Sequence, residues 1–168
     1  MIGACLADAI RRAAEVRHGK PEVITRAWTS RPYLTRWLVS EYRGRKVFLH
    51  HFQDSDADEM HDHPWNFVSV ILSGGYWEKT PARGPLTWNG TGPTREQWYG
   101  PGRVLVRPLN WIHSVRLPHG PGGPRDCWTL LYIGPKVRPW GFWCPKAGWV
   151  PWKKHLMNFY KTGAGCPE

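Results

Sequence analysis

Apolar residues recur at helical spacing near the start of the chain, whereas short apolar and aromatic runs dominate the sequence from Tyr33 onward. Within residues 4–17 the apolar side chains gather on one helical face and the charged side chains on the other, which predicts a short amphipathic helix. From Tyr33 the runs are rich in β-branched and aromatic residues and are separated by glycine and proline, as expected for strands and turns. The expected strands lie at residues 36–40, 46–52, 65–76, 97–99, 103–107, 111–117, 127–133 and 140–143, with loops at 81–93 and 120–124. Residues 152–160 are expected to form a closing helical segment.

About eight short strands at regular spacing predict an all-β sandwich or barrel. At 168 residues and 19.4 kDa, the chain is expected to form a single domain over residues 1–168, with the barrel core at about 33–145. The N-terminal helix is expected to cover one side of this barrel, and binding to a partner is the alternative role. No run reaches the length of a membrane span, and the N-terminus lacks the charge order of a secretory signal, so a cytoplasmic location without membrane contact is expected.

The net charge of +10 is unevenly distributed along the chain. Residues 51–100 carry three Lys/Arg against seven Asp/Glu, while both flanking segments are basic. A basic protein favours an anionic small-molecule substrate or a polyanionic partner such as nucleic acid, and a plain solvated surface is the alternative. The sequence contains no tight lysine and arginine block that would select nucleic acid.

The four cysteines, Cys5, Cys127, Cys144 and Cys166, contain no Cys-X-X-Cys pair. In a reducing cytoplasm the expected state of all four is the free thiol.

A pair of histidines separated by one residue is the clearest chemical signal in the chain. Residues two apart on a strand point to the same face, so His61 and His63 can direct two imidazoles at one point. A neighbouring strand that carries His113 can supply a third. Three neutral imidazoles predict a site for a divalent transition metal, with open positions for water or substrate.

The same residues resemble the two sequence motifs of the cupin superfamily. The first motif contains His-X-His and a closing glycine, which match His61-Asp62-His63 and Gly75. The second motif contains a glycine, a proline and a histidine at fixed spacing, which match Gly102, Pro108 and His113. The resemblance covers about residues 46–133. It implies an all-β jelly-roll barrel (a double-stranded β-helix), with a short N-terminal helix and a short C-terminal helical segment added here.

Two features refine this resemblance. Asn110 stands where the second motif has its middle glycine, and asparagine tolerates the left-handed turn conformation that glycine supplies. The aromatic stretch at 140–152, together with the His61–Trp65 segment, makes the chain similar to small cupin-like proteins of bacteria and phages. These tryptophans are expected to plug one end of the barrel, and a stacking platform for a planar ring is the alternative.

The glutamate ligand of the cupin motif is absent, because its position falls on Phe67 or Val68. Some cupin-like thiol dioxygenases and diketone-cleaving enzymes hold ferrous iron with three histidines. The resemblance therefore implies Fe(II), with zinc, manganese or nickel as alternatives. Three neutral ligands leave the two positive charges of the ion uncompensated, which favours an anionic or chelating substrate.

Further site residues are expected around this centre. His51 is a candidate fourth ligand, because it shares a strand face with Gln53 that can point inward. Asp62 alternates away from its neighbours, so it is expected to bond a neighbouring loop or to orient a second group. Glu78 is expected at the barrel mouth. The candidate catalytic residues are His51, Tyr76 and Glu78, and the candidate substrate-binding residues are Arg36, Arg103 and Arg107.

Three functions remain open from the sequence. The first is a three-histidine iron dioxygenase or related oxidoreductase. The second is a non-redox sugar or nucleotide-sugar isomerase, epimerase or lyase, in which a metal acts as a Lewis acid beside a general base. The third is a non-catalytic binding or regulatory protein with a nucleic-acid or protein partner. The family resemblance also suggests a homodimer.

Overall fold

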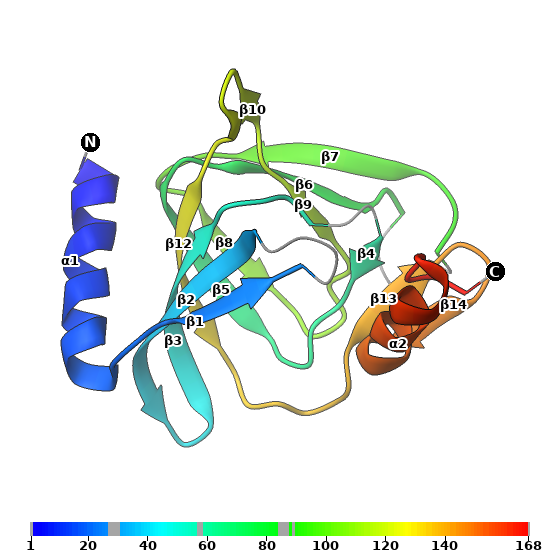
Figure 1. Ribbon diagram of the computed structural model, residues 1–168, viewed down its shortest axis with the longest axis horizontal. Helices are drawn as coiled ribbons and strands as arrows, with labels where there is room; N and C mark the ends of the chain where they lie inside the picture. Colours follow the sequence, from blue (N-terminus) through cyan, green and yellow to red (C-terminus); the bar gives the residue numbers. More distant parts are fainter. Residues whose placement is uncertain (1, 27–30, 57–58, 84–87, 89, 168) are drawn as a thin grey trace.

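The computed structural model describes residues 2–26, 31–56, 59–83, 88 and 90–167, and it consists mainly of antiparallel strands with one helix near each end (Figure 1). Part of the predicted loop at 81–93 lies outside the described residues. The elements are α1 (Ile2–His18), β1 (Glu22–Thr25), β2 (Pro32–Tyr42), β3 (Arg45–Phe52), β4 (Met60–His61), β5 (Phe67–Ser73), β6 (Tyr76–Pro81), β7 (Thr94–Tyr99), β8 (Val104–Arg107), β9 (Ser114–Arg116), β10 (His119–Gly120), β11 (Gly123–Pro124), β12 (Cys127–Ile133), β13 (Gly141–Cys144), β14 (Gly148–Pro151) and α2 (Trp152–Thr162). The prediction of an all-β jelly roll with two short helical additions is confirmed.

Two main sheets form the barrel. The larger has the strand order β1-β2-β3-β12-β5-β8, and the smaller has the order β7-β6-β9. A third sheet, β14-β13-β4, lies at the side opposite α1, next to α2 (Figure 1). All the strand pairings are antiparallel, and non-sequential neighbours such as β12 between β3 and β5 are typical of a jelly roll.

Helix α1 packs on the outer face of the large sheet, as the amphipathic pattern predicts. Ala7 and Ala14 are buried there against Trp37 and Leu49. The Trp37 indole donates a hydrogen bond to the Glu15 carboxylate at 2.9 Å, and its ring stacks on Trp128 at 5.6 Å. No helix among the described residues is long and apolar enough to span a membrane.

The interior of the barrel has an apolar region and a polar region. The apolar cluster consists of Ile71, Tyr76, Leu105, Val115, Leu117 and Cys127. A second apolar cluster, next to the polar region, consists of Phe48, Phe67 and Ile133. Between these clusters the inward positions carry histidine, glutamate and arginine, which are costly to bury unless they are paired.

The predicted strand at 65–76 is divided by a tight turn. Gly74 and Gly75 both have positive φ, at 74° and 151°, and they reverse the chain from β5 into β6. A Cβ atom on Gly75 would lie 2.6 Å from the Tyr99 carbonyl oxygen and from the Trp98 ring. Glycine is therefore required at this position by the backbone conformation and by the close approach of β7.

The cysteine prediction is wrong for one pair. Cys144 at the end of β13 and Cys166 in the C-terminal tail form a disulfide, while Cys5 and Cys127 are free. The two partners lie 22 residues apart in sequence, and they meet because β14 and α2 turn the chain back on itself. A spacing of this kind contains no local motif that identifies the pair.

Candidate metal centre

Backbone pairing brings His61 and His113 side by side. The amide of His61 donates to the carbonyl of His113 at 2.8 Å, and the amide of His113 donates back to the carbonyl of His61 at 3.0 Å. On its other side His61 pairs with Phe142 of β13. Strand β4 ends at His61, so the His61–His63 pair does not lie on one continuous strand as predicted.

Asp62 holds the chain so that its two neighbouring histidines turn inward. Its buried carboxylate accepts hydrogen bonds from the Gly141 amide at 2.9 Å, from the Trp149 indole at 3.0 Å and from the Arg138 guanidinium. The prediction that Asp62 points away from the histidines and bonds a neighbouring segment is confirmed. The partner segment is the tryptophan-rich region around β13 and β14, which packs beside β4 (Figure 1).

The three histidine rings converge on one point. Their centroids lie 5.0–5.1 Å apart, and one ligand atom from each of His61, His63 and His113 lies within 4.8 Å of the others. The Nε2 atoms of His63 and His113 are only 2.9 Å apart. We call this group the histidine triad.

Glu78 orients one member of the triad. The Nδ1 atom of His113 lies 2.7 Å from Oε1 of Glu78 and donates to it, which leaves the Nε2 lone pair directed at the other histidines. The same carboxylate accepts hydrogen bonds from the Trp111 indole at 3.0 Å and from Arg107 through both Nε and Nη2. A carboxylate behind a histidine is the usual arrangement around a metal-binding imidazole.

The prediction that Glu78 lies at the barrel mouth is wrong. Its side chain is 2% exposed, because β6 starts directly after the glycine turn and places Tyr76, Glu78 and Thr80 on its inward face. Glu78 also pairs in register with Val115, two residues beyond His113, which brings the carboxylate under the histidine.

Two histidines of the triad are neutral, and the carboxylate beside the third is ionised. Burial lowers the pKa of His61 to about 4 and lowers the pKa of His63 well below its usual value. Burial by itself raises the pKa of Glu78, but the hydrogen bonds and charges of His113 and Arg107 outweigh it and lower this pKa to about 2. His61 and His63 therefore present neutral imidazole nitrogens, and imidazole is a ligand suited to zinc, copper, iron and nickel.

Comparison with solved structures identifies the architecture. The polyketide cyclase RemF from Streptomyces resistomycificus matches 84% of this chain and 90% of its own at 18% identity, with a TM-score of 0.53. Iron(II) HppE matches 70% of this chain and 58% of its own at 10% identity, with a TM-score of 0.51. A cupin domain from Bordetella pertussis tohama i matches 63% of this chain and 98% of its own at 17% identity, with a TM-score of 0.43. The chain has the cupin fold. No protein-family model matches its sequence, and a search of curated proteins finds no match.

The cupin barrel turns His50 inward and His51 outward. His51 stacks on Trp128 at 4.0 Å, and its Nε2 lies 2.6 Å from the Asp126 carboxylate on the outer face of the large sheet. Gln53 shares that face and accepts a hydrogen bond from Thr35. The expectation that His51 is a fourth ligand of the triad is therefore wrong, because its side chain lies on the outer face of the sheet.

His50 takes the inward position. Its ring lies 5.8 Å from those of Phe48 and Phe52, and its buried Nε2 has no hydrogen-bond partner among the described residues. Burial, with a smaller contribution from the charge of Arg36, lowers the pKa of His50 to about 3. Nothing in the sequence distinguishes His50 from His51, because both faces of β3 carry apolar residues.

The candidate arginines occupy three different settings. Arg107 is buried and bonded to Glu78, with its guanidinium 4.2 Å from the Trp111 ring centroid. Arg36 pairs with the exposed Glu22 at 2.7 Å and lies over the Phe48 ring at 5.0 Å. Arg103 is exposed at the turn before β8. The structure therefore brings Arg107 to the triad as the partner of its carboxylate.

Tyr76 is buried in the barrel wall near Phe52 and Tyr99. Burial, followed by the charge of Glu78, raises the pKa of its hydroxyl far above the usual value. The hydroxyl therefore stays protonated and can act as a hydrogen-bond donor.

We predict that His50 makes the protein less stable in acid. The imidazole titrates near 6.5 in the unfolded chain and near 3 in the folded one, so the unfolded state binds more protons between these values. The contribution of His50 to the free energy of unfolding is fully present above pH 6.5 and is lost as the pH drops toward 3. At about pH 4.5 the free energy of unfolding should already be lower by about 3 kcal/mol.

The measurement is urea unfolding of metal-free protein across this pH range, with His50→Leu as the reference. Both chains keep the triad, so only the difference between their slopes reports on His50. Parallel slopes would show that His50 is not held neutral by burial.

Proposed function

We propose that this cupin is a metal-dependent enzyme whose triad holds ferrous iron for an oxygenase reaction on a small anionic substrate. The observation that carries the proposal is the convergence of three imidazoles, one of them backed by a buried carboxylate. His61, His63 and His113 are the ligands, and Glu78 is the residue that positions His113.

The donor set fits such an ion. Imidazole suits iron as well as zinc, nickel and copper, and the use of only three protein ligands leaves coordination positions for substrate. When bound by the triad, a ferrous ion would supply the binding and activation of dioxygen. The solved structure of HppE carries iron(II), which supports iron as the first metal to test.

The roles left for the other side chains favour oxygenase chemistry over proton transfer. A non-redox reaction needs a general base near the metal. Glu78 already accepts hydrogen bonds from His113, Arg107 and Trp111, and Tyr76 remains protonated. Both are therefore poor bases.

The substrate is expected to be small, largely apolar and anionic. Phe48, Phe52 and Phe67 surround the polar region, so the interior offers aromatic surface with few hydrogen-bonding groups. Arg36 is the arginine best able to pair the substrate's anionic group. Its ion pair with the exposed Glu22 is of the kind that contributes little and exchanges readily.

A second candidate is a non-redox metal enzyme, such as an isomerase, epimerase, lyase or cyclase. The specific observation in its favour is the buried, unpartnered Nε2 of His50, which can accept a hydrogen bond from a substrate. One of the similar solved structures is that of a polyketide cyclase, and a cyclase is among the enzymes of this second group. The nucleic-acid partner and the homodimer remain predictions from charge and family resemblance.

Nitric oxide tests the first candidate without knowledge of the substrate. We expect metal-free protein, reconstituted with ferrous iron under anaerobic conditions, to bind about one iron per chain and to give a high-spin iron–nitrosyl signal in electron paramagnetic resonance. Zinc-loaded protein is the silent control. Failure to bind iron, or an iron centre that does not react with nitric oxide, would exclude the oxygenase. Turnover of a substrate by zinc-loaded protein without dioxygen would establish the second candidate.

A further inference from the structure

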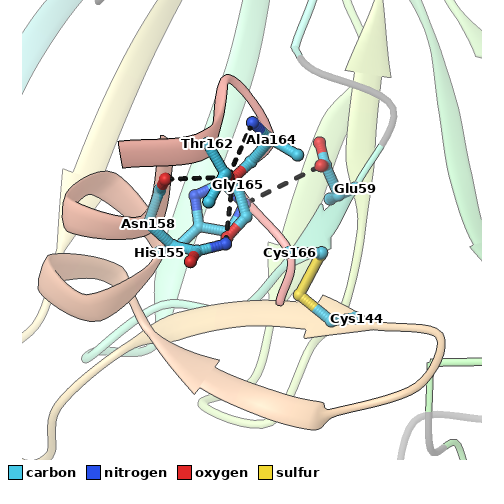
Figure 2. Close-up of a disulfide and its surroundings, with 8 residues drawn as sticks. All are labelled: Glu59, Cys144, His155, Asn158, Thr162, Ala164, Gly165 and Cys166. Atoms are coloured by element: carbon cyan, nitrogen blue, oxygen red, sulfur yellow. Dashed lines mark hydrogen bonds and ion pairs between the residues drawn. A yellow bond between two sulfur atoms is a disulfide. The ribbon is translucent and has the colours of Figure 1, made fainter. Parts of the chain in front are cut away.

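A second group of metal-binding side chains lies beside the barrel, away from the triad. Figure 2 shows Cys144 at the end of β13, Cys166 in the C-terminal tail and His155 on α2, with Glu59 facing them from the segment before β4. One ligand atom from each of Cys144, His155 and Cys166 lies within 4.8 Å of the others. We call these three residues with Glu59 the C-terminal cluster.

Local structure explains why these residues meet. Helix α2 ends at Gly163, which adopts a left-handed conformation with φ of 78° and turns the tail back along the helix. Gly165 then packs so closely on His155 that a Cβ atom there would lie 2.0 Å from the imidazole ring. The ring also stacks on Phe142 at 3.9 Å. The imidazole is thereby held between the tail and β13.

One imidazole nitrogen in this cluster is buried without a hydrogen bond. The Nε2 atom of His155 has no hydrogen-bond partner among the described residues. The Glu59 carboxylate lies 3.8 Å from it, which is too far for a hydrogen bond but close enough for attraction (Figure 2). Burial of such a nitrogen is unfavourable unless a ligand satisfies it.

We propose that the C-terminal cluster is a zinc site when the disulfide is reduced. Two thiolates, one imidazole and one carboxylate are a complete set of four ligands of the types that zinc prefers. The pairing of Cys144 with Cys166 is then the oxidised form of the same site.

Conversion of the oxidised form into the zinc-bound form begins with reduction of the disulfide. A dithiol reductant gives two electrons and two protons to the disulfide, which becomes two thiols while the reductant becomes a disulfide. Zinc then binds both sulfurs as thiolates and releases two protons. The sulfurs must separate to about 3.8 Å, the distance set by two zinc–sulfur bonds of about 2.3 Å at a tetrahedral angle. A cavity of about 400 Å³, lined in part by Glu59, Met60 and Cys166, gives access to the site.

Either form ties the C-terminal tail to the sheet that supports the triad. Cys144 ends β13, and β13 pairs with β4, where Met60 and His61 directly follow Glu59. The cluster therefore fastens the outer side of the strand that carries one triad ligand. Zinc would preserve this fastening where the surroundings keep thiols reduced.

Cobalt(II) is the probe that separates the two sites. We expect reduced full-length protein to give a thiolate-to-cobalt charge-transfer absorption in the near ultraviolet, because the C-terminal cluster supplies sulfur. The oxidised protein should lack this absorption, since its disulfide sulfurs do not bind and the triad contains nitrogen ligands only. With zinc, the reduced chain should hold roughly two ions and the oxidised chain roughly one.

Substitutions assign the signal to named residues. Cys166→Ser and His155→Ala should each lose the second zinc and weaken or abolish the charge-transfer absorption, while Cys5→Ser, a change at an exposed thiol on α1, should leave both intact. The comparison of oxidised with reduced wild-type protein needs no substitution, so it decides the matter even if a variant fails to fold. A reduced wild-type protein without the absorption, or an absorption that Cys166→Ser leaves undiminished, would overturn the proposal.

Discussion

Replacing His113 by alanine should remove the metal from the triad. His113 supplies one of only three ligands, and it is the one fixed on both sides, by its backbone bridge to His61 and by Glu78. Loss of a supporting residue alone costs about 10–100-fold in metal affinity, so loss of the ligand itself should exceed about 100-fold. The same result is expected for His61→Ala and His63→Ala.

The measurement is the metal content of purified protein, followed by competition with a chelator to obtain the change in affinity. His119→Ala is the matched control, because His119 is exposed on β10. Reduction of the samples must be avoided, so that the C-terminal cluster stays oxidised and contributes no metal. Retention of full metal occupancy by all three triad variants would remove the basis for every function proposed for this centre.

The fold and the triad could be predicted because their signals are local. His61 and His63 are two positions apart, and Gly75, Gly102 and Pro108 mark turns whose positions along the chain determine which strands follow. The physical requirement behind Gly75 is visible in the structure, where no side chain fits between the turn and β7. Such constraints act on single residues, so they leave a readable pattern.

The supporting residues could not be predicted, because their roles depend on register. Glu78 was expected at the mouth, and its true place depends on how β6 pairs with β9. A shift of β3 by one residue in register would turn His51 inward and His50 outward. Both faces of this strand are covered, one by the barrel interior and the other by α1 and Trp128. Sequence periodicity therefore contains no information that separates them.

The C-terminal residues were missed for a different reason. Asp62 was correctly expected to bond a neighbouring segment, but its partners Arg138, Gly141 and Trp149 lie about eighty residues away. The contact of Cys144 with Cys166 likewise arises only once α2 has folded back. The first contact joins the residue after β4 to the segment around β13 and β14, and the second joins β13 to the C-terminal tail. The region supporting the triad is therefore completed by the last part of the chain.

Removing the charge of Glu78 should weaken both the fold and the metal site. The carboxylate is 2% exposed and bonded to Arg107, which would be left as a buried, unpaired cation in Glu78→Gln. Breaking one side of a buried ion pair costs about 3–5 kcal/mol. The pKa gives a similar figure: a fall from 4.5 to about 2 corresponds to about 3 kcal/mol, present above pH 4.5 and lost as the pH falls toward 2.

Metal affinity should fall by about 10–100-fold in the same variant, because the amide of glutamine holds the His113 tautomer less firmly than a carboxylate does. Urea unfolding of metal-free protein and chelator competition measure the two effects separately. Arg107→Met is the informative comparison: it should also lower stability, yet it leaves the bond between Glu78 and His113 in place. In the double variant Glu78→Gln/Arg107→Met no buried charge is left unpaired, so its loss of stability should be smaller than the sum of the two single losses by about 0.5–3 kcal/mol. Additive losses would show that Arg107 and Glu78 act independently, and an unchanged metal affinity in Glu78→Gln would show that the carboxylate stabilises the barrel without tuning the triad.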